Sequence, residues 1–244
     1  MRNLLALAII IVGVAAYIMI VSSNGAFRPG DEAAETHLSS QKNIQLEPFT
    51  GIDILGAFKV KLIQDEQQLL EASGDEGLVE AVRYEVQNGT LKIWMEKHAR
   101  KSGDLQLYIH SAEFHKLNIH GTSELESQTP IRGESLELRI SGTGDVNLDL
   151  YVKRLETRVS GAGDLDLKGT AEALEINLSG AGNIDAEELL AQRVEVRISG
   201  TGNADVHASE SLDVSISGLG NVTYSGEPTT LNKRISGMGR LNKK

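Results

Sequence analysis

Apolar and polar positions alternate with a period of two through the C-terminal half of the chain. Apolar side chains alternate with charged ones from Leu136 to Ile140, and the alternation resumes from Val146 to Leu150. A period of two predicts a strand with one buried and one exposed face. This stretch therefore predicts two strands that are joined by a short turn rich in glycine.

The same strand–turn–strand unit recurs every 18 to 20 residues. The tetrapeptide pattern Ser-Gly-x-Gly, which marks the turn, begins at Ser141, Ser160, Ser179, Ser199, Ser217 and Ser236. A fixed period of this length is typical of a solenoid, in which each repeat forms one coil stacked on the previous one. The pattern therefore predicts an all-β protein, a parallel β-solenoid (β-helix) with coils of about 19 residues.

Stacking the coils in register aligns three columns of inward side chains, which together would form one shared aliphatic core. The first column is Leu136, Leu155, Leu174, Val194, Leu212 and Leu231, and the second is Ile140, Val159, Leu178, Ile198, Ile216 and Ile235. The middle column is Leu138, Thr157, Ile176, Val196, Val214 and Lys233. The lysine in the last coil predicts that this coil frays or is capped.

We interpret the Ser-Gly-x-Gly turns as structural corners. Glycine reaches positive φ without a clash of a Cβ atom, and we expect Gly161 and Gly180 in particular to adopt such angles. Serine and Asp or Asn side chains at a turn can hydrogen-bond exposed backbone groups. The predicted corner residues are Ser141, Gly142, Gly144, Asp145, Ser160, Gly161, Gly163, Asp164, Ser179, Gly180, Gly182, Asn183, Ser199, Gly200, Gly202, Asn203, Ser217, Gly218, Gly220, Asn221, Ser236, Gly237 and Gly239.

The outward positions of the first strand in each coil form two charged columns. The acidic column is Glu137, Glu156, Glu175, Glu195 and Asp213; the basic column is Arg139, Arg158, Arg197 and Arg234, with Asn177 and Ser215 between them. Like charges one rung apart repel by about 0.9 kcal/mol in water, and diagonal pairing with the opposite column can offset this repulsion. The pattern favours a solvated face of balanced charge, and a ligand-binding surface of alternating charge is the alternative.

Residues 44–100 interrupt the repeat and predict a β-rich segment that caps the first coil. Strand-like alternation flanks Gly56, and Asn88-Gly89 lies between two further alternating stretches, which is a strong hairpin signal. The sequence Ser73-Gly74-Asp75-Glu76 predicts a capping box for a short helix that ends at Val82. Residues 101–241 are predicted to form the repeats, beginning with an imperfect coil at His120-Gly121-Thr122-Ser123.

The N-terminus contains a stretch without charge from Leu4 to Val21, preceded by Arg2. This stretch is just long enough to span a bilayer and is long for the core of a signal peptide. We predict that residues 1–25 form an apolar signal-anchor helix in the inner membrane or a signal peptide cleaved near Gly25; a buried helix of a soluble protein is the remaining alternative. Residues 26–43 are predicted to form a linker. If the chain is exported by either route, the residues after the linker lie in the periplasm or cell envelope.

Composition narrows the possible functions. Aromatic residues make up 4% of the chain, glycines number 25, and cysteine is absent. These values suit a narrow aliphatic solenoid, and the lack of cysteine excludes disulfides, thiolate metal sites, a cysteine nucleophile and a lipid on an N-terminal cysteine. The net charge of −10 disfavours a broad nucleic-acid surface.

Three short segments and the serial turns together carry a resemblance to a known family. The segments are Phe49-Thr50-Gly51-Ile52, Gly56-Ala57-Phe58-Lys59-Val60 and Asn88-Gly89-Thr90-Leu91-Lys92-Ile93. From about Ile44 to Leu241 the chain resembles the putative auto-transporter adhesin head GIN-domain family. The resemblance implies a right-handed β-solenoid, export and an adhesin-like role, and it transfers no catalytic residue. Many relatives look like lipoproteins, whereas this chain would attach through its apolar N-terminus.

Calcium and glycoside chemistry are both disfavoured. The turns resemble the nonapeptide calcium repeat, but the positions where that repeat needs Asp hold Val146, Leu165 and Ile184. The acidic column Asp166, Asp185 and Asp205 has the roughly 5 Å spacing of a retaining glycosidase. Any acidic column of a solenoid has this spacing, and the coils from Leu136 onward contain only two aromatic residues that could hold a sugar, Tyr151 and Tyr224.

Histidines recur as His98, His110, His115 and His120. Alignment with the repeat places His115 on an inward column and His120 on the serine column. We interpret them as incidental or structurally satisfied residues in preference to a zinc site, and we expect no metal, cofactor or catalytic residue.

The sequence thus favours a non-catalytic envelope protein with an adhesin-like surface. Its partner would be an unidentified envelope protein or glycan, it would meet the membrane through residues 4–21, and it would bind no nucleic acid. A structural or self-assembling envelope module, with self-association of the chain, is the alternative. A polysaccharide-active enzyme is a less favoured one.

Overall fold

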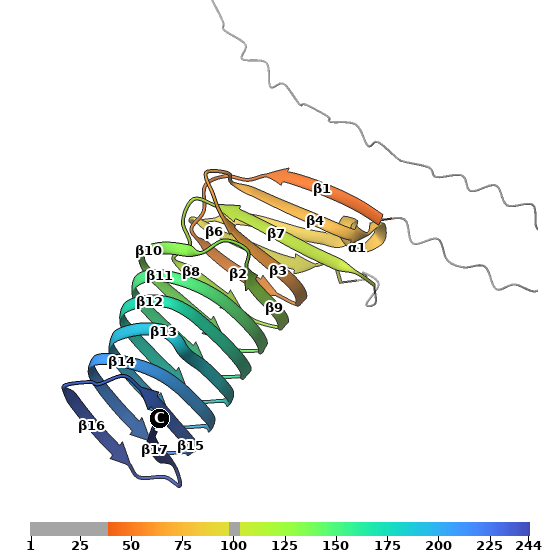
Figure 1. Ribbon diagram of the computed structural model, residues 1–244. Helices are drawn as coiled ribbons and strands as arrows, with labels where there is room; N and C mark the ends of the chain where they lie inside the picture. The colour runs from red at the N-terminus through yellow and green to blue at the C-terminus, as the bar shows by residue number, and fades with distance from the viewer. Residues whose placement is uncertain (1–38, 98–102) are drawn as a thin grey trace, which may run out of the picture. The chain divides into compact units, whose positions relative to one another are not determined.

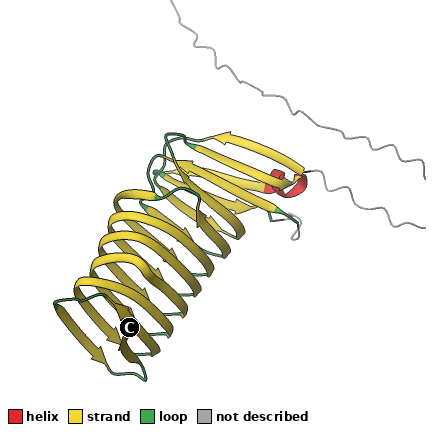
Figure 2. Cartoon of the chain, viewed as in Figure 1, coloured by secondary structure: helices red, strands yellow, loops and turns green. Residues whose placement is uncertain are grey.

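The computed structural model describes residues 39–97 and 103–244, which belong to one compact unit, residues 37–244. The predicted signal or anchor segment, most of the predicted linker and His98 lie outside the described residues. Within the described ranges, no helix is both long and apolar enough to cross a membrane. By itself this unit is a stack of about seven β-coils with one short helix near one end (Figures 1 and 2).

The described elements in chain order are β1 (Ser39–Gln45), β2 (Gly51–Leu55), β3 (Ala57–Gln64), β4 (Leu69–Asp75), α1 (Glu76–Ala81), β5 (Val82–Gln87), β6 (Thr90–Met95), β7 (Leu105–Ser111), β8 (Lys116–Ile119), β9 (Thr122–Ser127), β10 (Ile131–Ile140), β11 (Thr143–Val159), β12 (Ala162–Leu178), β13 (Ala181–Ile198), β14 (Thr201–Ile216), β15 (Leu219–Ser225), β16 (Thr230–Ile235) and β17 (Arg240–Lys243).

From β8 onward, each coil stacks in parallel on the one before it (Figure 1). Strands β10 and β11 pair with β8 and β9, strands β11 to β14 pair successively, and β15 to β17 complete the last coils. The register aligns Asp145 with Asp164, then Asn183, Asn203 and Asn221, as the repeat predicts. The prediction of an all-β parallel solenoid is therefore confirmed.

The aliphatic core follows the three predicted columns. Every member of these columns from Leu136 to Ile216 is at most 3% exposed. Each buried Leu, Ile or Val side chain stabilises the fold by about 1.5–3 kcal/mol relative to an exposed one. The last coil also forms, but Leu231 and Ile235 there are 45% and 36% exposed, and Lys233 occupies the middle column between them.

The corner glycines are needed because adjacent coils approach each other closely. Our expectation of positive φ at Gly161 and Gly180 is wrong, since neither lies in the left-handed region. A Cβ atom added at Gly180 would instead lie 1.9 Å from the carbonyl oxygen of Gly161 in the previous coil. The same approach, 1.9 to 2.1 Å, recurs along what we call the corner column: Gly121, Gly142, Gly161, Gly180, Gly200, Gly218 and Gly237. At this corner, the backbones leave no room for a side chain.

The first strands stack in an order that differs from their order in the chain. Strands β2 and β3 form a coil that lies between β8–β9 on one side and β6–β7 on the other, all in parallel. Beyond this coil the sheets continue in antiparallel strands: β4 on β7, β1 on β4, and β5 on β6. We call residues 39–111 the cap and residues 116–243 the repeat.

Local predictions in the cap are partly right. The hairpin β5–β6 forms, and Asn88 and Gly89 at its turn both have positive φ, 51° and 72°, as a primed two-residue turn requires. Helix α1 also forms, but the predicted capping box does not: Ser73 lies in β4, and the N-cap Asp75 makes no side-chain capping bond. Residues 39–43, which we expected in the linker, belong to β1 because they pair with β4.

Candidate functional site

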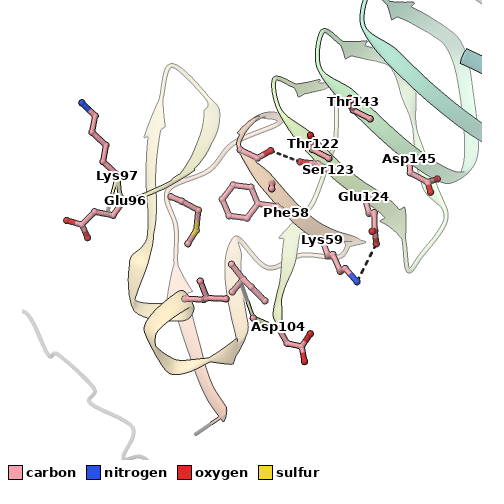
Figure 3. Close-up of a pocket in the computed structure, with 16 residues that line it drawn as sticks. Phe58, Lys59, Glu96, Lys97, Asp104, Thr122, Ser123, Glu124, Thr143 and Asp145 are labelled. Atoms are coloured by element: carbon pink, nitrogen blue, oxygen red, sulfur yellow. Dashed lines mark hydrogen bonds and ion pairs between the residues drawn. The ribbon is translucent and has the colours of Figure 1, made fainter. Parts of the chain in front are cut away.

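A cleft of about 730 Å³ lies where the corner column meets the cap. Figure 3 shows its lining residues, which come from Gly56, β3, β9 and β11 and from α1, β6 and β7. Further lining residues lie between β6 and β7: Glu96, Lys97, Gly103 and Asp104. The coil formed by β2 and β3 turns at the single residue Gly56, whereas β6 ends at Met95 and β7 begins only at Leu105. The cleft opens beside Gly56.

The floor of the cleft is apolar. It is formed by Phe58, Leu78, Met95 and Leu105; the first two are buried and the last two are partly buried against the core. Phe58 is the first inward residue of β3, and Leu78 lies on the buried side of α1. Such a floor can receive the apolar part of a ligand, and the flexible Met95 side chain can adapt to its shape.

The rim of the cleft carries charges of both signs. The Lys59 ammonium lies 3.8 Å from a carboxylate oxygen of Glu124, and the other charged lining residues are Glu96, Lys97, Asp104 and Asp145 (Figure 3). The side chains of the Lys59–Glu124 pair are 62% and 63% exposed, so the pair stabilises the fold by at most about 1 kcal/mol. A ligand could therefore replace this ion pair at little cost.

Hydroxyl groups line the side of the cleft that faces the repeat. Thr122 and Thr143 occupy equivalent positions in adjacent coils and are both exposed. The Ser123 hydroxyl donates a hydrogen bond to the carbonyl of Gly56, at 3.2 Å. An apolar floor with a few polar groups around it is the usual composition of a non-covalent binding site.

The predicted corner serines join each coil to the one before it. The hydroxyls of Ser141, Ser160 and Ser179 donate to backbone carbonyls of the preceding coil over 3.3–3.4 Å. His120, on the same column as predicted, places Nδ1 2.9 Å from Ser141 Oγ. These residues therefore connect successive coils along the corner, at increasing distance from the cleft.

The predicted Asp/Asn column forms a side-chain ladder between coils. Asn183 donates to Asp164 at 3.2 Å, Asn203 to Asn183 at 3.0 Å, and Asn221 to Asn203 at 3.1 Å. In addition, the backbone N–H of Asn183 donates to Asp164 Oδ1 at 3.1 Å. The column therefore makes contacts from coil to coil, beyond the local turn bonds that we expected.

The two charged columns neutralise each other. The Arg158 guanidinium lies 2.8 Å from Glu137 in the preceding coil and also contacts Glu156 in its own coil. Arg197 repeats the pattern with Glu175, at 3.1 Å, and with Glu195. The diagonal pairing that the sequence predicts is thus present, and this face has a balanced charge.

The histidines are distributed over separate environments. His110 is buried in the cap, with Nδ1 2.8 Å from Asp65 and Nε2 3.8 Å from Glu71. Burial opposes ionisation of Asp65, but hydrogen bonds from His110 and the Gln67 N–H, together with the charge of His110, hold its pKa below the ordinary value. Our placement of His115 on an inward column is wrong: its side chain is 48% exposed, because the neighbouring Phe114 fills the core.

Acidic side chains do not form a metal site within the described part of the chain, where no three His, Asp or Glu side chains converge suitably. Asp166, Asp185 and Asp205 occupy equivalent positions in successive coils, so the coil stacking alone sets their spacing. Lys168 lies 3.5 Å from Asp166 and 3.7 Å from Glu188, and these carboxylates raise the pKa of Lys168.

The cleft is the feature that sequence reasoning missed. It brings together Phe58, Met95 and Thr143, which lie far apart in the chain and in three different strands. The one local signal is the segment Gly56-Ala57-Phe58-Lys59, which interrupts an alternating pattern and contributes four adjacent residues to the lining.

Comparisons with known proteins agree on a family and a fold. Residues 48–228 match the family model described as putative auto-transporter adhesin, head GIN domain. A putative adhesin from Bacteroides fragilis is 23% identical with a TM-score of 0.77, over 85% of this chain and 97% of its own. A putative adhesin from Parabacteroides distasonis is 21% identical with a TM-score of 0.69, over 86% and 98%.

A third structure, a putative lipid binding protein from Parabacteroides distasonis, is 24% identical with a TM-score of 0.67, over 84% of this chain and 96% of its own. At these identities, the structural likeness shows the fold. No curated protein matches the chain.

Proposed function

Since the chain belongs to the family described as putative auto-transporter adhesin, head GIN domain, we propose that it is an exported, non-catalytic envelope protein whose β-solenoid binds a protein or a glycan. The observation that carries this proposal is the cleft between the cap and the repeat. Its apolar floor and mixed, weakly paired rim suit reversible binding.

The stacked coils suit the task of holding such a site in a fixed shape. Most lining residues belong to five strands of one hydrogen-bonded sheet system or to α1, which packs against β1 and β4. Rigid elements position binding groups more accurately than loops do. A ligand that meets this surface therefore loses little free energy to ordering of the protein.

Export is part of the proposal and rests on the uncharged stretch from Leu4 to Val21. In this account residues 4–21 anchor the chain in the inner membrane, or cleavage near Gly25 releases it. A reporter that is active only in the cytoplasm, fused after Lys244, should give no signal. A strong cytoplasmic signal from this fusion would reject the topology.

The binding proposal is tested by filling the cleft in the full chain. Thr122→Trp places a large side chain in the cleft, and Thr201→Trp is the matched control because Thr201 occupies the equivalent corner position several coils away. We expect affinity recovery from the native envelope, and a glycan array, to show a ligand that Thr122→Trp loses and Thr201→Trp keeps. The proposal is contradicted if no ligand is recovered, or if every recovered ligand is held equally by both variants.

A self-assembling module is the second candidate, and the last coil favours it. All residues of β16 are exposed, and Met238 beside it is 82% exposed. Exposed apolar groups next to a strand edge promote association. Sedimentation of the full chain in detergent distinguishes the two candidates, because a monomer at every concentration rejects self-assembly.

A further inference from the structure

A second depression, of about 440 Å³, lies on the outer surface of the later parts of β11, β12 and β13. Its walls are the side chains of Tyr151 and Leu190, which are 38% and 54% exposed. Thr170 lies between them, because the register pairs Tyr151 with Thr170 and Thr170 with Leu190. A small side chain between two large ones in one column produces the hollow.

One face of the Tyr151 ring is covered and the other is directed into the depression. The Arg132 guanidinium carbon lies 4.3 Å from the ring centroid, and Arg132 belongs to the coil before Tyr151. The opposite ring face is therefore directed toward Thr170 in the following coil. Two rungs separate Tyr151 from Leu190 by roughly 9.6 Å. With contact distances of about 3.5–4 Å at each wall, one layer of ring atoms fits between them.

The polar groups beside the depression favour an uncharged ligand. Lys153 is already paired with Glu134 at 2.8 Å, and Glu172 lies 3.9 Å from Arg193. The neighbouring charges thus compensate each other, whereas the Thr170 hydroxyl and the Gln192 amide at this site are neutral hydrogen-bonding groups.

We propose that this depression binds a pyranose unit of a neutral glycan, with the sugar ring between Tyr151 and Leu190. A pyranose has C–H faces that can pack on an aromatic ring and hydroxyls at its edge that can bond Thr170 and Gln192. An anionic glycan would bring its charge beside Glu172 and would have to compete with Glu134 for Lys153, the cation of the described lining. This inference goes beyond the proposed function, because it adds a second site for neutral sugars that shares no residue with the cleft.

The test measures sugar binding to the full chain in a detergent that contains no sugar. The probes are the neutral methyl glycosides of glucose, galactose, mannose and N-acetylglucosamine and their short oligomers, with glucuronate and galacturonate oligomers as acidic counterparts. Saturation-transfer NMR detects binding and titration gives the affinity. Tyr151→Ala is the test variant and Tyr84→Ala is the matched control, because Tyr84 in the cap is 37% exposed and lies outside the depression.

We expect at least one neutral oligosaccharide to bind, and Tyr151→Ala to weaken its binding at least about tenfold, as loss of an aromatic anchor commonly does. Thr170→Trp, which fills the hollow from an exposed position, should abolish binding, and Tyr84→Ala should leave it unchanged. Binding of acidic oligomers only, binding unaffected by Tyr151→Ala, or no sugar binding would each overturn this inference. None of these outcomes alters the Thr122→Trp test, which can still reveal a protein ligand at the cleft.

Discussion

Gly89 in the cap and Gly180 in the repeat both require glycine, but for different physical reasons. At Gly89 in the cap, φ is 72° and an added Cβ atom would meet nothing within 4 Å, so the backbone angle alone favours glycine. At Gly180 in the repeat, the angle lies outside the left-handed region, but an added Cβ atom would lie 1.9 Å from a backbone oxygen. A glycine that recurs with the period of a solenoid can therefore reflect the distance between coils instead of a turn type.

Two buried hydroxyl groups, one in each region, also differ in their surroundings. Ser111 in the cap is fully buried, and its hydroxyl lies 2.8 Å and 2.9 Å from the carbonyls of Phe49 and Glu113. Thr157 in the repeat is equally buried between Leu138 and Ile176, and its hydroxyl has no hydrogen-bond partner. The Ser111 hydroxyl joins irregular segments of the cap, whereas Thr157 replaces an apolar member of a core column.

The largest expected effect comes from the corner column. Gly180→Ala should lower the free energy of unfolding by about 3 kcal/mol or more, because two backbones must separate to admit the methyl group. The control is Gly133→Ala, where an added Cβ atom meets nothing within 4 Å and stability should change little. Urea unfolding followed by circular dichroism measures both. Equal stability of the two variants would show that coil distance does not select glycine.

Removing the hydroxyl of Ser111 and removing that of Thr157 should change the free energy of unfolding in opposite directions. Ser111→Ala should destabilise by about 1–2 kcal/mol, because the carbonyls of Phe49 and Glu113 lose the one hydroxyl donor that they share. Thr157→Val should stabilise by about 1 kcal/mol, because it removes a desolvated hydroxyl that makes no bond. Denaturation midpoints of the two variants and the parent chain give the signs. Destabilisation by Thr157→Val would mean that its hydroxyl is satisfied in solution.

A smaller effect is expected at the cap hairpin. Gly89→Ala should cost about 1 kcal/mol, since alanine can adopt the left-handed region with modest strain and no clash. Comparing this loss with that of Gly180→Ala shows how much more stability a backbone clash costs than a strained φ angle. A loss at Gly89 as large as that at Gly180 would remove the distinction.

The smallest effect is expected in the Asp/Asn column. Asp164→Asn should stabilise by about 0.5 kcal/mol, because the new amide can donate to Asp145 while its oxygen still accepts from Asn183. The substitution also removes the repulsion between the carboxylates of Asp145 and Asp164, which lie one rung apart. A small rise in melting temperature checks this prediction, and a clear fall would show that the Asp164 charge is needed.

Much of the repeat could be predicted because its contacts are encoded by a period. Leu136, Leu155 and Leu174 stack since each coil repeats the same register, and the hairpin at Asn88-Gly89 follows from local turn chemistry. The conformations of Gly161 and Gly180 could not be predicted in this way. A glycine that avoids a clash and a glycine that adopts positive φ look the same in a sequence.

The cap and the cleft could be predicted much less well because their contacts join distant parts of the chain. No local pattern indicates that β6 stacks on β2 ahead of it, or that β8 lies on the other side of β2. The cleft depends on this order, since it places Met95 opposite Thr143. His115 shows the same limit on a small scale: the repeat gives its register, while the packing of Phe114 decides which side chain is buried.

The central claim is that ligand binding occurs where the cap meets the repeat, and site-specific photo-crosslinking of the full chain in its native envelope tests it most directly. One photo-reactive residue replaces Thr122 in the cleft, and in a second variant it replaces Thr201, the equivalent position far along the repeat. The account predicts a discrete crosslinked product from position 122 that is at least several times weaker from position 201. Equal products from both positions, or a product from position 201 alone, would contradict it.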